Sequence, residues 1–131
     1  MPEAAKRIPD AAAQPFLASV IDREGFIEPA QFSGMLRLTK SELAAAAGLP
    51  RDAVSKATRR GAPATQTRLR EVAEIINRVL PWCGSVQQAF AWYRSQPIPA
   101  FGDQTAENLV RHGRAEHVLD YLGGIALGGY A

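Results

Sequence analysis

Residues 39–60, TKSELAAAAGLPRDAVSKATRR, hold the two helices and the turn that decide the fold. Thr39 is a favourable N-cap and Glu42 follows three residues later, so the pair forms a capping box in front of an apolar run. The residues up to Ala47 are strong helix formers. Gly48 predicts the end of this helix, because the sharp turn needs a left-handed backbone that glycine adopts at little cost.

A second helix is predicted after the turn, over residues 51–60. Small Ala44 permits two helices to cross closely, and Leu49 and Val54 are expected to pack beneath the turn at Gly48. This spacing matches the helix-turn-helix of repressor-like regulators, whose second helix enters the major groove of DNA. The alternative is an ordinary αα-hairpin with a solvated basic face. The residues predicted to face DNA are Arg51, Asp52, Ser55, Lys56, Arg59 and Arg60.

Charge supports the DNA-binding interpretation. The segment 35–70 contains eight bases and two acids, a net charge of +6, whereas the whole chain carries only +2 and the remainder is therefore −4. A basic segment on an otherwise mildly acidic protein is typical of contacts to DNA phosphates. The eight bases are Arg37, Lys40, Arg51, Lys56, Arg59, Arg60, Arg68 and Arg70.

Composition narrows the class of protein further. With 131 residues, of which 47% are hydrophobic and 21% charged, the chain suits one globular domain or two small ones. No stretch is long and apolar enough to cross a membrane, and the polar start MPEAAKRIPD leads us to expect no signal peptide. The single cysteine, Cys83, fits a reducing compartment. We therefore expect a cytoplasmic protein.

The rest of the chain is also predicted to be helical, and no segment has the pattern of a strand, so the predicted fold is all-α. Residues 1–14 are expected to form a flexible tail, residues 15–64 a helix-turn-helix domain and residues 65–131 a small helical domain. Helix 66–80 connects the halves, with Thr65 as its N-cap and Pro81 as its stop, although it can also belong to both cores. The other predicted helices span residues 16–23, 29–38, 85–95 and 115–127, together with a helix that begins at Thr105 or Asp103 and is ended by Gly113.

Two glycines, Gly123 and Gly124, fall inside the last predicted helix, where each costs about 1 kcal/mol relative to alanine. Three explanations stay open: close packing of two helices, a helix that stops early at Leu122, or a surface kept flat for a partner.

No catalytic motif is present, and we expect that the protein is not an enzyme and holds no cofactor or metal. His112 and His117 are five residues apart, which misses the spacing of a helical metal pair. Cys83 has no cationic neighbour in sequence and is interpreted as a small buried hydrophobe rather than a reactive thiol. Four aromatic residues have either a core or a base-stacking role, of which the core role is favoured: Trp82, Phe90, Trp92 and Tyr93.

The C-terminal part, from Ala89 onward, resembles the toxin-binding domain of the Xre/MbcA/ParS-type antitoxins. The resemblance rests on the helix with Trp92, the Pro-x-Pro link at 97–99, the Phe-Gly turn at 101–102 and the Gly-Gly-Tyr ending. It also includes the motifs Thr105-Ala106-x-x-Leu109-Val110-x-x-Gly113 and Val118-x-x-x-Leu122-x-x-Ile125. Many members have proline at the position of Ala106 and charged or polar residues at the positions of Gly123 and Gly124.

This resemblance implies a function and partners. Family members pair with RES-domain toxins, which are NAD-consuming enzymes resembling ADP-ribosyltransferases, and they inhibit the toxin with a C-terminal segment near its NAD cleft. The complex commonly represses its own operon, and the antitoxin is usually a homodimer within a hetero-oligomer. The alternative function is a helix-turn-helix regulator with a C-terminal dimerisation domain and no toxin partner. The residues that the resemblance implies for toxin binding are Leu127, Gly128, Gly129, Tyr130 and Ala131.

Overall fold

A computed structural model describes the backbone of residues 15–128, and the side chains of these residues except those at 57, 58, 127 and 128. The described chain is mostly helical and contains no strand. A helical segment at residues 15–20 comes first. It is followed by α2 (Pro29–Leu36), α3 (Lys40–Ala47), α4 (Arg51–Ser55), α5 (Ala57–Arg60), α6 (Pro63–Cys83), α7 (Val86–Ser95), the 3-10 turn η1 (Pro99–Phe101), α8 (Ala106–Arg111) and α9 (Ala115–Gly128).

Several helix ends follow from local chemistry, as the sequence predicts. Thr39 and Glu42 form the expected capping box at the start of α3. Ser85 and Thr105 cap α7 and α8, each by accepting a hydrogen bond from the backbone N–H three residues later. These side chains satisfy N–H groups that have no partner within the helix. The predicted starts of these three helices are therefore confirmed.

The ends of α6 differ from the prediction. The helix begins at Pro63 after an N-cap at Ala62, and Thr65 is a buried residue inside it. It also continues through Pro81 to Cys83 and ends at Gly84, whose φ is 93°. Proline lacks an N–H donor, but only two helical residues follow it, and the buried Leu80 beside it keeps this turn packed on the core.

The helix predicted over residues 16–23 is shorter in the structure, because its helical turns end at Val20. Ile21 instead pairs with Ile27 as an isolated antiparallel bridge around a turn at Gly25. Ile27 is almost fully buried, so the bridge folds the chain back toward the core before α2 begins.

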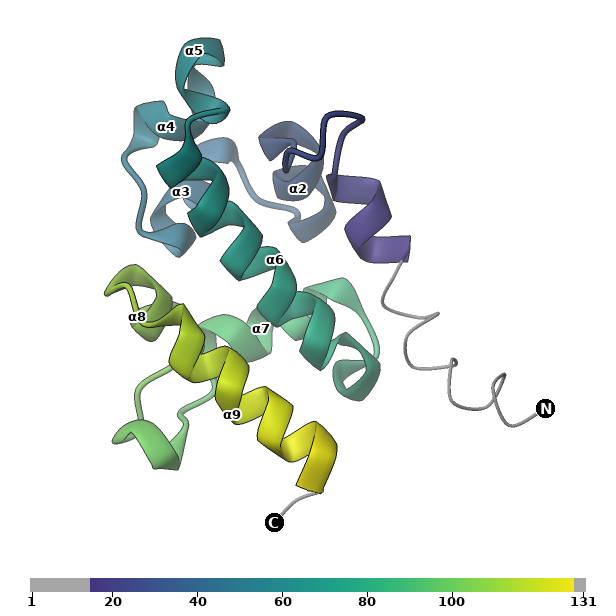
Figure 1. The fold of residues 1–131 in the computed structure, drawn as a ribbon, viewed down its shortest axis with the longest axis vertical. Coiled ribbons are helices and arrows are strands. Elements are labelled where there is room, and N and C mark those ends of the chain that lie inside the picture. The colour runs from purple at the N-terminus through teal and green to yellow at the C-terminus, as the bar shows by residue number, and fades with distance from the viewer. Residues whose placement is uncertain (1–14, 129–131) are drawn as a thin grey trace, which may run out of the picture.

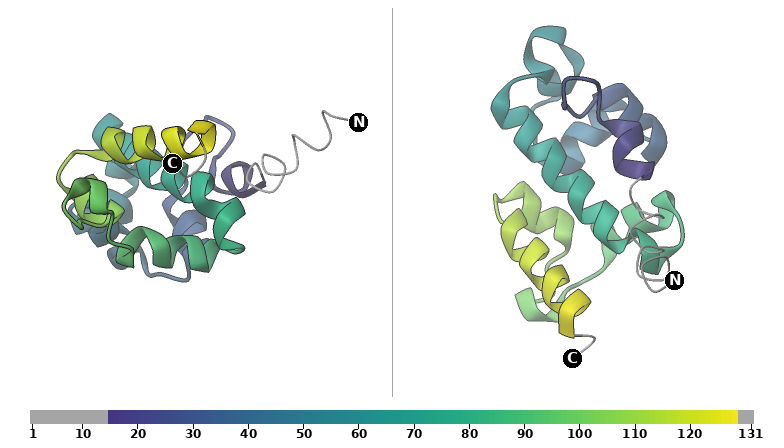
Figure 2. Two further views of the ribbon diagram at one scale, coloured as in Figure 1. Left: turned by 90° about the horizontal axis from the view of Figure 1, so that it is seen from below. Right: turned by 45° about the vertical axis from the view of Figure 1, so that its right-hand side comes forward.

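Helix α6 lies at the centre of the molecule, with the N-terminal helices around its first half and α7, α8 and α9 around its second half (Figure 1; Figure 2). One cluster of buried apolar side chains extends from Phe16 to Leu122 and includes residues of both predicted domains. The boundary at residues 61–64 stays a prediction. The shared core favours the alternative in which this connecting helix belongs to both halves.

Helix α9 continues past both glycines to Gly128, so the idea that it stops at Leu122 is wrong. A Cβ at Gly124 would meet no atom within 4 Å, and one at Gly123 would meet only the Arg78 guanidinium at 3.6 Å. Close packing therefore does not require either glycine. Of the side chains expected to face inward, Val118 and Leu122 are buried, whereas Ala126 is exposed.

Candidate nucleic-acid interface

The predicted helix-turn-helix is centred on the turn between α3 and α4. Gly48 adopts the left-handed conformation, with φ 68°, and its N–H donates to the Ala45 carbonyl at 3.1 Å. The Leu49 N–H donates to the Ala44 carbonyl at 2.8 Å, which closes the C-terminal cap of α3. Ala44 and Val54 are almost fully buried on either side of the turn, as predicted. Local sequence and packing therefore specify the same turn.

The second helix differs from the prediction. Residues 51–60 do not form one helix, because Lys56 has an extended backbone, with φ −94° and ψ 129°, between α4 and α5. Only Ala53 and Val54 are buried on α4, whereas Ser55 and Lys56 are exposed. Helices this short depend on buried contacts for stability, so the helix breaks where those contacts end.

The residues predicted to contact DNA belong to α4, to α5 and to the residue between them, and these two helices lie at one end of the molecule (Figure 1). Arg51, Ser55, Lys56 and Arg59 are exposed, and Asp52 and Arg60 are half-buried. The cations are thus presented by two short helices and the extended residue between them, rather than by one recognition helix.

Two of the four basic side chains are already engaged in ion pairs. The Lys56 ammonium lies 3.6 Å from an Asp52 carboxylate oxygen, and an Arg60 nitrogen lies 3.9 Å from Glu28. Exposed pairs of this kind contribute at most about 1 kcal/mol, so DNA phosphates can replace them. Within the described part of the chain, Arg51 and Arg59 form no ion pair.

Two bases of the +6 segment form hydrogen bonds to backbone carbonyls of the protein itself. Arg68 donates to the carbonyls of Ala47 and Val110, at 3.1 and 2.8 Å, and lies 3.6 Å from Glu71. Arg70 donates to the Gly25 carbonyl at 2.8 Å. Both were counted in the predicted basic segment as outward-facing residues. A charge count gives no information on such intramolecular bonds, because the acceptors are backbone carbonyls far away in sequence.

Burial near this site raises the pKa of two side chains. Tyr93 donates its hydroxyl to the Ala46 carbonyl at 2.7 Å, and burial raises the pKa of its hydroxyl, so the residue is neutral. Burial also raises the pKa of the Glu71 carboxyl, although the neighbouring Arg68 partly opposes that effect. Gln66 bonds to both backbone polar groups of Ile27 and thereby joins α6 to the N-terminal turn.

The histidines and the cysteine of the described residues do not form a metal site. They contain no group of three or more potential metal-ligating side chains. His112 contacts the Asn108 carbonyl of its own helix, and the ring of His117 stacks on Phe101. Burial raises the pKa of the Cys83 thiol, which disfavours the reactive thiolate. No helix in the described part of the chain is long and apolar enough to span a membrane.

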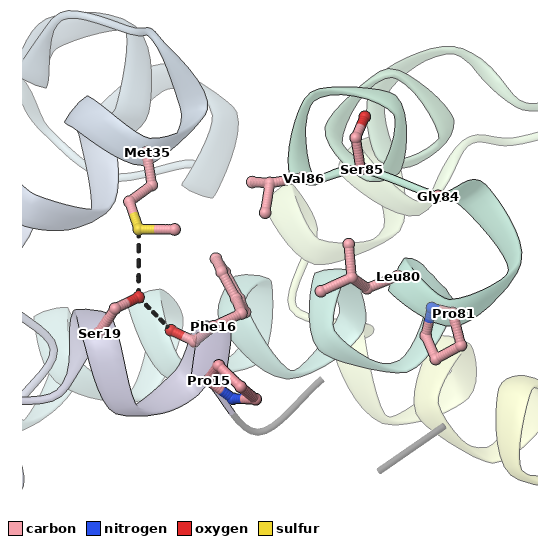
Figure 3. Close-up of a pocket in the computed structure, with 9 residues that line it drawn as sticks. All are labelled: Pro15, Phe16, Ser19, Met35, Leu80, Pro81, Gly84, Ser85 and Val86. Atoms are coloured by element: carbon pink, nitrogen blue, oxygen red, sulfur yellow. Dashed lines mark hydrogen bonds between the residues drawn. The ribbon is translucent and has the colours of Figure 1, made fainter. Parts of the chain in front are cut away.

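An apolar groove lies away from the basic end, between the first helical segment, α2 and the junction of α6 with α7 (Figure 3). Its volume is about 550 Å³, and Phe16 points into it from one wall and Leu80 from another. Met35 extends from α2 along one side of the groove, and its sulfur accepts a hydrogen bond from Ser19 at 3.1 Å. Beside this junction, Trp82 is 55% exposed, so its predicted place in the core is wrong. Phe90 and Tyr93 are buried, and Trp92 packs against the core.

The predicted toxin-binding residues lie at the edge of the described structure. Residues 129–131 are outside it, and for residues 127 and 128 only the helical backbone is described. Comparison with known proteins adds no assignment, since no family model, no curated protein and no solved structure matches the chain.

Proposed function

We propose that this protein is a DNA-binding antitoxin that inhibits a RES-type, NAD-consuming toxin and represses its own operon. The observation that carries the DNA-binding part is the turn at Gly48, which is followed by the exposed Arg51 and Lys56 in the region of α4 and α5, at one end of the molecule (Figure 1). The toxin-binding part rests on the resemblance of residues 89–131 to the Xre/MbcA/ParS-type antitoxins.

The arrangement supports phosphate contacts and a small number of base contacts. Exposed arginines supply planar donors that suit both phosphates and guanine edges. Lys56 lies at the break between α4 and α5, where it is exposed and 3.6 Å from Asp52. Because the four residues of α5 add Arg59 within one further turn, the basic surface is short and suits one half-site of a dimer.

The experiment is a titration of DNA from the upstream promoter with a variant carrying Arg51→Ala and Lys56→Ala. Each lost base contact should cost about 1–3 kcal/mol, and each lost phosphate contact should reduce the salt dependence of binding. The charge-matched control carries Arg78→Ala and Arg114→Ala, two exposed arginines outside the helix-turn-helix. Unchanged affinity in the first variant, or equal losses in both, would exclude the assigned surface.

The toxin-binding part is tested by removal of residues 129–131. The segment after α9 contains Tyr130, an aromatic residue of the type that is enriched at binding hot spots and suits the polar groups of an NAD cleft. The shortened protein should still bind the toxin through its helical faces but should no longer block NAD turnover or protect cells. Full protection by the shortened protein would show that inhibition lies elsewhere.

A regulator without a toxin is the competing function. It predicts operator binding by the full chain and no complex with any product of the neighbouring genes. A neighbouring reading frame for a RES-domain protein that co-purifies with the chain would instead support the antitoxin proposal.

A further inference from the structure

The guanidinium of Arg68 joins the C-terminal ends of two helices that are far apart in sequence. One nitrogen donates to the Ala47 carbonyl at the end of α3 and to the Val110 carbonyl in the last turn of α8, at 3.1 and 2.8 Å. The same side chain lies 3.6 Å from Glu71 on its own helix. Helix C-termini carry unpaired carbonyls and a partial negative charge, so one cation at both ends removes their mutual repulsion.

The C-terminal half satisfies two of the last four carbonyls of α3. The caps within the turn satisfy the carbonyls of Ala44 and Ala45. The next two carbonyls, of Ala46 and Ala47, accept hydrogen bonds from Tyr93 and Arg68. The C-terminal half therefore completes the hydrogen bonding of the first helix of the helix-turn-helix.

Steric contact adds a second connection at the same place. A Cβ placed on Gly48 would lie 2.9 Å from the Arg111 Cα and 3.0 Å from an Arg68 nitrogen. The backbone of the turn thus rests directly against the backbone of α8. A shift of α8 cannot leave the turn and α4 where they are, because close-packed interiors do not absorb such shifts.

We propose that Arg68 is a positioning residue that makes the placement of α4, and so the affinity for DNA, depend on the placement of α8. The inference rests on the proposed DNA binding for its functional consequence. A ligand that binds the C-terminal half and moves α8 changes DNA affinity through this contact, and DNA binding changes the affinity for that ligand by the same factor.

The test compares full-length variants on two readouts. Arg68→Gln removes the charge and the forked donor, and Arg68→Lys keeps the charge with a different donor geometry. Arg78→Gln is the control, because it removes the same charge from an exposed position on the same helix. The first readout is the backbone amide NMR shift of Leu49 and Val54, which reports the turn in the folded state whatever the global stability.

The second step perturbs the C-terminal half by Val118→Ala, a change in the buried face of α9. In the wild-type background this substitution should move the Leu49 and Val54 amide resonances and reduce affinity for promoter duplex DNA. In the Arg68→Gln or Arg68→Lys background the added effect should be clearly smaller, because only the backbone contact at Gly48 remains, whereas it should persist in full with Arg78→Gln. The coupling between the two substitutions should be about fivefold or more in DNA affinity.

Additive effects of Arg68 and Val118 substitutions on the amide shifts would overturn the proposal. If Arg68→Gln does not fold, Arg68→Lys decides the result by the same criterion. Failure of the wild-type chain to bind any promoter DNA would instead refute the proposed function. The amide shifts need no DNA and would still decide whether Arg68 positions the turn.

Discussion

Removal of the Tyr93 hydroxyl oxygen tests the connection between α7 and the end of α3 by a change of one heavy atom. Tyr93 is completely buried, and its hydroxyl donates to the Ala46 carbonyl at 2.7 Å. The intrahelical caps of α3 reach the carbonyls of Ala44 and Ala45 but not that of Ala46. Tyr93→Phe keeps the ring and its stacking on Phe90, so it removes one hydrogen bond with little change in apolar packing.

The expected loss follows from leaving a buried acceptor without its donor, which costs about 1–3 kcal/mol. At about 2.1 cal/mol/K of unfolding entropy per residue, the 131 residues of this chain make 1 kcal/mol equivalent to about 3.6 °C. Tyr93→Phe should therefore lower Tm by about 4–11 °C.

The assay is thermal and urea unfolding followed by circular dichroism in the helix band at about 222 nm, with Tyr121→Phe as the matched control. The Tyr121 ring packs edge-on against Phe101, and its hydroxyl has no hydrogen bond among the described residues. A Tm for Tyr93→Phe that equals that of Tyr121→Phe would refute the view that the C-terminal half satisfies the end of α3.

Four further outcomes are expected. Gly48→Ala should destabilise the fold by about 2 kcal/mol or more in urea unfolding, because its φ is 68° and its Cβ would lie 2.9 Å from the Arg111 Cα. Gly124→Ala should stabilise α9 by about 0.5–1 kcal/mol in the same assay, since the new methyl group meets no atom within 4 Å; a loss of stability would contradict this. Burial raises the pKa of the Glu71 carboxyl, so the folded state binds more protons than the unfolded state near that pKa. The free energy of unfolding should therefore fall as pH rises through and just above the usual glutamate range. The Glu71→Gln variant should show a flatter pH profile in that range. A fragment of residues 65–131 should show weak helical circular dichroism, because the shared core leaves its inner face uncovered, and a cooperative unfolding transition would instead support the predicted domain boundary.

The turn between α3 and α4 illustrates what local chemistry can predict. The capping box, the left-handed Gly48 and the buried Val54 each follow from residue type and spacing, and the structure contains all three. The break at Lys56 was not predictable in this way, since residues 51–60 contain no proline or glycine after the turn. It comes directly after α4, on which only Ala53 and Val54 are buried, and burial is a property of the packed molecule.

The sequence by itself determined the helical class, most helix ends and the residues at the basic end, because caps, turns and apolar periodicity act over a few residues. Only the tertiary structure decided that one core serves both halves and that Arg68 belongs to the interior network rather than to the free basic surface. Its acceptors, the carbonyls of Ala47 and Val110, lie near the C-terminal ends of helices, where backbone carbonyls have no partner within the helix. Every residue type has such a carbonyl, so residue type does not mark these acceptors. Side-chain bonds to such groups leave no pattern in the sequence, and they form only where packing brings the helix ends together.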